Sequence, residues 1–103
     1  MRVDILYFEG CPNSNLTRAR VLEALALQGV VADVRMIEIQ DAEHAIAQRF
    51  LGSPTVRIDG QDAEPPARLR DDYGFMCRTY RASDNSTAGA PSVQLISEAL
   101  RDR

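Results

Sequence analysis

The chain contains two cysteines, Cys11 and Cys77, whose thiols are its strongest candidate nucleophiles. A thiolate attacks disulfides and also binds soft metal ions, so these residues predict either redox chemistry or metal binding. Cys11 stands between an apolar run and a helical pattern. The dipole at the start of such a helix favours a negative charge, which makes Cys11 the predicted nucleophile. The alternative is an ordinary small residue in a turn.

Pro12 and Ser14 belong to the stretch "CPNS" that begins at Cys11. Proline suits the first helical turn, because an N–H there would have no intrahelical partner. We expect Ser14 to donate a hydrogen bond to a thiolate at Cys11. The polar residues of this stretch predict that the start of the helix is open to a substrate.

Cys77 has three interpretations. It lies among aromatic residues in "DDYGFMCRTY", where a free cysteine is often a buried small hydrophobe. It is alternatively a resolving thiol that releases a mixed disulfide formed by Cys11. The flanking cations Arg78 and Arg81 would favour its thiolate. In the third interpretation, the two cysteines together bind a soft metal such as mercury or copper.

Composition limits the function classes. The chain has 103 residues, 45% of them hydrophobic, and a net charge of −3. We expect one domain over residues 1–103, no nucleic-acid binding and a monomer or weak dimer. No run reaches the roughly 18 apolar residues of a membrane span, and no signal peptide is recognisable, so we expect a cytoplasmic protein with free thiols. No zinc spacing or cofactor motif is present, so apart from the soft-metal interpretation of the two cysteines neither a metal nor an organic cofactor is implied.

The elements around the cysteines follow from hydrophobic periodicity. An apolar run predicts a strand over residues 3–8, and helical spacing predicts a helix over residues 13–28 that stops at Gly29. Alternation predicts a strand over residues 31–39, and a further helical pattern covers residues 41–51. The apolar face predicted for the first helix consists of Leu16, Ala19, Leu22, Leu25 and Ala26.

The second half of the chain is less regular. Residues 55–58 predict a third strand, and Asp59-Gly60 is a strong hairpin signal that leads to a short fourth strand over residues 61–64. The remaining predictions are irregular chain over residues 65–90, with a turn of helix in 73–81 and a loop over 82–90, and a helix over 92–101. This order predicts an α/β protein with a mixed four-stranded sheet and helices on both faces.

These features resemble the thioredoxin-like fold. "CPNS" is similar to the glutaredoxin active-site "CPYC", and "SPTVRIDG" resembles the cis-proline segment of thioredoxins and glutaredoxins. "FEGCPN" with a later "GSPTVRIDG" resembles small bacterial thioredoxin-like proteins sometimes labelled alkylmercury lyase-like. The resemblance implies a cis bond at Pro54 and a role for Pro12, Ser53, Pro54 and Thr55 in binding an extended substrate. A trans proline at an edge strand is the alternative.

The chain departs from these families in three respects. Ser14 stands where glutaredoxins have a second cysteine, the usual glutathione-binding residues after the fourth strand are missing, and the "CGFS" of cluster-binding members is absent. The resemblance therefore implies a thiol–disulfide oxidoreductase with Cys11, Ser14 and Cys77 as catalytic residues. Its partner is then a disulfide-containing protein or a low-molecular-weight thiol. A soft-metal or organomercurial handling protein and a non-catalytic binding module remain the alternatives.

Overall fold

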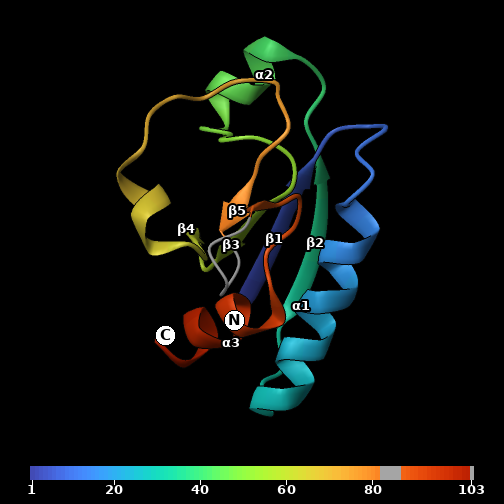
Figure 1. Cartoon of the computed structure of the whole chain (residues 1–103), viewed down its shortest axis with the longest axis vertical. Helices are drawn as coiled ribbons and strands as arrows, with labels where there is room; N and C mark the ends of the chain where they lie inside the picture. The colour runs from blue at the N-terminus through green and yellow to red at the C-terminus, as the bar shows by residue number, and fades with distance from the viewer. Residues whose placement is uncertain (82–86, 103) are drawn as a thin grey trace.

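A four-stranded mixed sheet forms the centre of the molecule (Figure 1). The computed structural model describes residues 1–81 and 87–102. The strands β1 (Arg2–Tyr7), β2 (Asp33–Glu38), β3 (Thr55–Ile58) and β4 (Gln61–Asp62) lie in the order β2-β1-β3-β4. β2 is parallel to β1, whereas β3 is antiparallel to β1 and β4 is antiparallel to β3. The predicted mixed four-stranded sheet is confirmed.

Helices cover both faces of the sheet. α1 (Ser14–Gln28) and α3 (Val93–Arg101) pack against Val3 and Ile5 on one face. α2 (Ala42–Ala47) contributes Ala45 to a smaller core around Leu6 and Phe50. Because successive side chains of a strand alternate between faces, β1 supplies both cores. The described helices all fall short of the length and apolar content that a membrane crossing requires.

The buried face of α1 differs from the predicted one. Of the five residues expected to face the core, only Leu25 is buried, while Leu16 and Leu22 are 43% and 41% exposed. The buried set is Thr17, Val21, Ala24 and Leu25. Thr17 is tolerated in the core because its hydroxyl donates a hydrogen bond to the Asn13 carbonyl at 2.7 Å. Apolar residues lie on two sides of this helix, so periodicity alone selected the wrong one.

α2 is shorter than the helix predicted over residues 41–51. It ends at Ala47 because Arg49 adopts a left-handed conformation with φ 54°. The N–H groups of Arg49 and Phe50 then donate to the carbonyls of Ile46 and Ala45, which closes the last turn. The left-handed residue that ends a helix is usually glycine. Arg49 occupies that position here, so nothing in the sequence indicated that the helix ends before residue 51.

The hairpin between β3 and β4 is confirmed at Asp59-Gly60. Both residues have positive φ, 49° and 86°, as the tightest hairpin turns require. The fourth strand is shorter than the predicted 61–64 and ends at Asp62.

The region after β4 contains more structure than expected. A 3₁₀ helix, η1 (Pro65–Leu69), occupies part of the predicted irregular chain. The chain then swings away from the sheet and returns beside β3 (Figure 1). We call residues 74–81 the returning segment. It bends at residues 75 and 76, forms a bridge at Cys77 and ends as a strand, so the turn of helix predicted in 73–81 is wrong.

The returning segment ends in β5 (Tyr80–Arg81), which pairs with β6 (Thr87–Ala88). Residues 82–86 of the predicted loop over 82–90 lie outside the described residues. Residues 87 and 88 of that loop are in β6, which corrects the prediction there.

Two leucines of α1 test which side of the helix faces the core. Leu25→Ala should lower the free energy of unfolding by about 2–5 kcal/mol, because it opens a cavity in the core. Leu22→Ala on the exposed side should lower it by less than about 1 kcal/mol. Urea unfolding of the two variants measures both values. Equal losses, or a larger loss at Leu22, would show that the described packing of α1 is wrong.

Candidate active site

Cys11 lies in the turn between β1 and α1. It is half-buried and not in a disulfide, and its N–H donates to the Phe8 carbonyl at 3.2 Å. Gly10, with φ 88°, supplies the positive φ that this turn needs. α1 starts at Ser14, three residues after Cys11, and its N-cap residue Asn13 makes no side-chain capping bond. The thiol therefore belongs to the turn that leads into the helix rather than to its first residues.

Ser14 and Pro12 have contacts that differ from the expected ones. The Ser14 hydroxyl donates to the backbone carbonyl of Cys11 at 3.3 Å rather than to the sulfur. A hydroxyl has one proton, so this bond and donation to a thiolate exclude each other. Pro12 is exposed and precedes the N-cap, so it lies outside the first helical turn.

Ser53 and Pro54 form a buried loop next to the end of β1, and Thr55 follows them as the first residue of β3. The Ser53–Pro54 peptide bond is cis. The Phe8 N–H donates to Ser53 Oγ at 3.3 Å, which joins this loop to the strand that leads to Cys11. The Thr55 hydroxyl donates to the Gly52 carbonyl at 2.6 Å. The loop therefore borders the turn that carries Cys11.

The returning segment pairs with this loop and brings Cys77 to it. The Ser53 N–H donates to the Met76 carbonyl at 2.8 Å, and the Arg78 N–H donates to the Ser53 carbonyl at 2.9 Å. Cys77 thus faces Ser53 in a parallel bridge. Its side chain is exposed and free, in contrast to a buried small hydrophobe. Phe75 packs its ring on Phe8 with the centroids 4.9 Å apart, so the segment also touches the end of β1.

Arg78 fixes the returning segment from inside the protein. Its side chain is 1% exposed, and it donates to both Asp62 carboxylate oxygens at 2.7 and 3.0 Å. It also donates to Thr55 Oγ1 at 3.1 Å and to Glu64 at 3.3 Å. The charge that was expected to flank Cys77 is therefore directed into the core and neutralised there.

The pKa values around Arg78 reflect this environment. Burial acts to lower the pKa of Arg78, but the hydrogen bond with Asp62 and the surrounding negative charges outweigh it, so the pKa is raised. Tyr80 lies under the guanidinium, 4.5 Å from ring centroid to Cζ, and burial raises its pKa. The Tyr80 hydroxyl donates to the Pro54 carbonyl at 2.5 Å. Arg78 and Tyr80 therefore stay protonated around neutral pH. Their hydrogen bonds to Thr55 and to the Pro54 carbonyl hold this part of the chain in place.

Gly52 is required where the returning segment crosses the loop. It has φ 120°, and a Cβ there would lie 2.9 Å from Cβ of Arg78. A real side chain is never that close to another, so only glycine lets the two backbones approach. Sequence reasoning missed Gly52, Asp62, Tyr80 and the internal role of Arg78. The acidic pair Asp62 and Glu64 gave no signal for Arg78, because Arg57 and Arg68 lie closer to it in the sequence.

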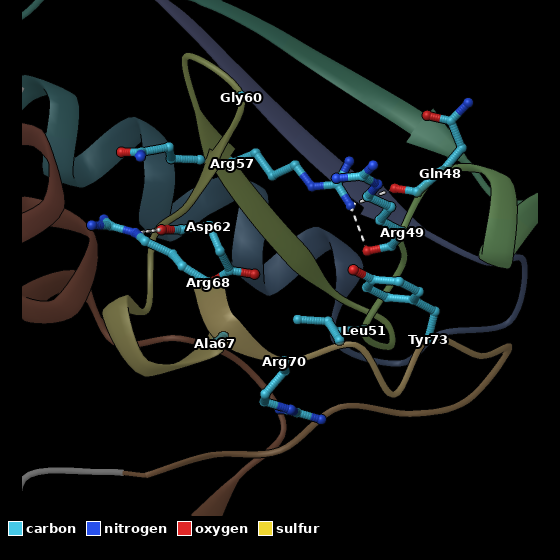
Figure 2. A pocket seen from close by; sticks show the side chains of 11 residues that line it. Gln48, Arg49, Leu51, Arg57, Gly60, Asp62, Ala67, Arg68, Arg70 and Tyr73 are labelled. Carbon is cyan, nitrogen blue, oxygen red and sulfur yellow. Dashed lines mark hydrogen bonds between the residues drawn. The ribbon is translucent and has the colours of Figure 1, made fainter.

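A hollow of about 210 Å³ is lined by residues of the β3–β4 hairpin, of η1 and of the chain after α2 (Figure 2). Its lining includes Arg49, Arg57, Arg68 and Arg70. Arg57 donates to the carbonyls of Gln48 and Arg49 at 2.6 and 2.8 Å and so caps the end of α2. Burial lowers its pKa. In Figure 2 the side chains of Arg57, Arg68 and Arg70 extend in different directions, so these cations do not converge on one anion.

No cluster of three or more His, Cys, Asp or Glu side chains suited to a metal ion occurs in the part of the chain that the structure describes. Comparisons with protein-family models, with curated proteins and with solved structures find no match to the chain. The case for a function therefore depends on the geometry around the two cysteines.

The buried pair predicts a large effect of one substitution. Asp62→Asn removes the bidentate partner of the buried Arg78 charge and leaves only Glu64, 3.3 Å away. The loss should be about 3 kcal/mol of unfolding free energy, at the lower end of the range for a broken buried ion pair. Asp33→Asn is the matched control, because Asp33 pairs with Arg35 at 2.9 Å on the surface. Surface pairs contribute little, so this variant should unfold like the parent protein. Similar urea midpoints for both variants would contradict the structural role of the Arg78–Asp62 pair.

Proposed function

We propose that the chain is a small thiol–disulfide oxidoreductase of thioredoxin-like fold, with Cys11 as nucleophile and Cys77 as resolving thiol. Several features support the fold assignment: the strand order β2-β1-β3-β4, the turn with Cys11 between β1 and α1, and the proline before β3. These are the features on which the resemblance to thioredoxins and glutaredoxins depends.

One observation carries the functional proposal: the backbone pairing of Ser53 with residues 76–78. It brings the second cysteine to the end of the sheet where the first one lies. Cys77 is far from Cys11 in sequence, so chain connectivity alone does not bring it to this end of the sheet. We take its position next to Ser53 as the sign of a role beside Cys11. Ser14 occupies the position at which glutaredoxins have their second active-site cysteine. The thiol of Cys77 can take over the role of that missing cysteine.

The proposed reaction is a pair of thiol–disulfide exchanges. The Cys11 thiolate attacks one sulfur of the substrate disulfide, which forms a mixed disulfide and releases the first substrate thiolate. The Cys77 thiolate then attacks Sγ of Cys11, which releases the second substrate thiolate and leaves a Cys11–Cys77 disulfide. The substrate gains two electrons and the protein loses them. A low-molecular-weight thiol or a dithiol protein restores the reduced state.

The remaining residues have supporting roles in the proposal. Pro12 is exposed next to Cys11, whereas Ser53, Pro54 and Thr55 are buried and support the turn from inside the protein. Ser14 holds the Cys11 carbonyl and thereby the turn. Free thiols match a reducing compartment, so we assign the protein to the cytoplasm. We propose that it acts as a monomer or weak dimer and without an organic cofactor.

A soft-metal or organomercurial handling protein is the second candidate. The observation in its favour is that both thiols are free and belong to elements that meet at Ser53 and Phe8. With two thiolates and no larger cluster among the described residues, the ion would be one that accepts two-coordinate sulfur, such as Hg²⁺ or Cu⁺. A binding module with an idle Cys11 is the third candidate.

Trapping experiments test the oxidoreductase proposal. Bis(2-hydroxyethyl) disulfide added to the reduced protein should produce a Cys11–Cys77 disulfide, detected by mass spectrometry of peptides. Cys77→Ser should stop at a stable mixed disulfide on Cys11, because no second thiol resolves it. Cys11→Ser should react no faster than an ordinary exposed thiol.

Two results would reject the proposal. In the first, the parent protein forms no internal disulfide. In the second, the Cys11→Ser variant is as reactive as the parent. Tight binding of one Hg²⁺ per chain, lost in either variant and unaccompanied by disulfide exchange, would support the metal-handling candidate instead.

A further inference from the structure

The surface beside Cys11 is already occupied by the chain itself. A polypeptide that docks by backbone pairing needs a free N–H and a free C=O on its partner. The loop residue next to the Cys11 turn is Ser53, whose Oγ accepts from Phe8 at 3.3 Å. Both backbone groups of Ser53 are bonded to residues 76 and 78, at 2.8 and 2.9 Å. An incoming peptide finds neither group available.

The returning segment is also firmly held in this position. Arg78 is anchored by the buried carboxylate of Asp62. The Gly74 N–H donates to the Phe50 carbonyl at 2.9 Å, and the Phe75 ring rests on Phe8. Removal of residues 76–78 from Ser53 would disturb contacts on both sides of Cys77. The segment therefore behaves as a fixed part of the site rather than as a loose lid.

The segment leaves room for small reactants. Cys77 is exposed and Cys11 is half-buried, so neither residue is enclosed in the core. A disulfide with short substituents needs access to a sulfur atom only, whereas an extended polypeptide also needs a place for its backbone. A small disulfide has only to reach Sγ of the half-buried Cys11, whereas backbone docking of a peptide conflicts with the bonds to Ser53.

We propose that the site selects low-molecular-weight disulfides and rejects extended polypeptide disulfides, and that residues 74–78 are the specificity determinant. This inference rests on the proposed oxidoreductase function and narrows its substrate class. The bonds that form and break are those of the exchange at Cys11 described above, with a small thiolate as the leaving group.

A matched pair of disulfides tests the selectivity. The first is bis(2-hydroxyethyl) disulfide. The second is an unstructured ten-residue peptide whose single cysteine carries the same mercaptoethanol group. Mass spectrometry measures the rate at which the Cys77→Ser variant consumes each disulfide, by attack on either of its two sulfurs. The rates with free dithiothreitol give the intrinsic reactivity of each disulfide. Relative to that reference, the small disulfide should react at least about tenfold faster than the peptide.

Two further substitutions, each added to the Cys77→Ser variant, test whether the returning segment causes the selectivity. Phe75→Ala removes the ring contact with Phe8 that holds the chain beside Met76, while the Arg78–Asp62 pair keeps the protein folded. The bond from the Ser53 N–H to the Met76 carbonyl should then open more often, so the peptide reaction should accelerate and the selectivity should shrink. Leu69→Ala is the matched control, because Leu69 is 92% exposed in η1 and should change neither rate. Melting temperatures of both variants verify that they are folded.

The outcomes separate this inference from the proposed function. Equal relative rates for the two disulfides, or a peptide rate that Phe75→Ala leaves unchanged, would overturn the selectivity while exchange at Cys11 stands. Absence of reaction with either disulfide would reject the oxidoreductase function, and the inference with it. Selective reaction with the small disulfide that Phe75→Ala weakens would support both.

Discussion

The buried ion pair between Arg78 and Asp62 is the interaction on which the arrangement of the two cysteines depends. Transfer of two charges out of water costs several kcal/mol per ion, and only close pairing with further hydrogen bonds offsets it. The pair meets this condition, since Asp62 accepts from Arg78 with both oxygens, at 2.7 and 3.0 Å. The two hydrogen bonds to Asp62 fix the position of the Arg78 guanidinium. Cys77, as its neighbour in the chain, is placed with it.

The cis-proline loop and the returning segment consequently stabilise each other. Thr55 and the ring of Tyr80 surround the guanidinium, and the Tyr80 hydroxyl holds the Pro54 carbonyl. The loop in turn offers the Ser53 backbone to the segment. Polar groups buried in such a network restrict one another to a single geometry. The candidate site is therefore rigid on the Cys77 side, while the Cys11 side is an ordinary strand-to-helix turn.

Local signals in the sequence identified most of the fold. The apolar run before Cys11, the stop at Gly29 and the Asp59-Gly60 turn each have a short-range cause, and each appears in the structure where expected. The position of Cys11 after the first strand followed from the same signals. The inward side of α1 did not, because Leu22 and Val21 are both apolar and tertiary packing decides between them.

The other half of the site could not be read from the sequence. A charged residue is normally exposed, and burial of Arg78 depends on a carboxylate that only the folded hairpin provides. Backbone pairing between Ser53 and residues 76–78 involves no side chain, so it leaves no pattern in the sequence. The early end of α2 at a left-handed Arg49 is similar, since arginine is not the residue that usually marks it.

The close crossing at Gly52 has a consequence for chains that resemble this one. Because the backbone of Arg78 occupies the space of a Cβ at position 52, every larger residue there would force the segment onto another route. A glycine before the serine–proline pair, together with an aspartate on the fourth strand and a later arginine, is thus a marker that can be sought in other genomes. Where the glycine is replaced, the segment that carries the second cysteine could not cross the loop at this point, whatever the ancestry of the chain.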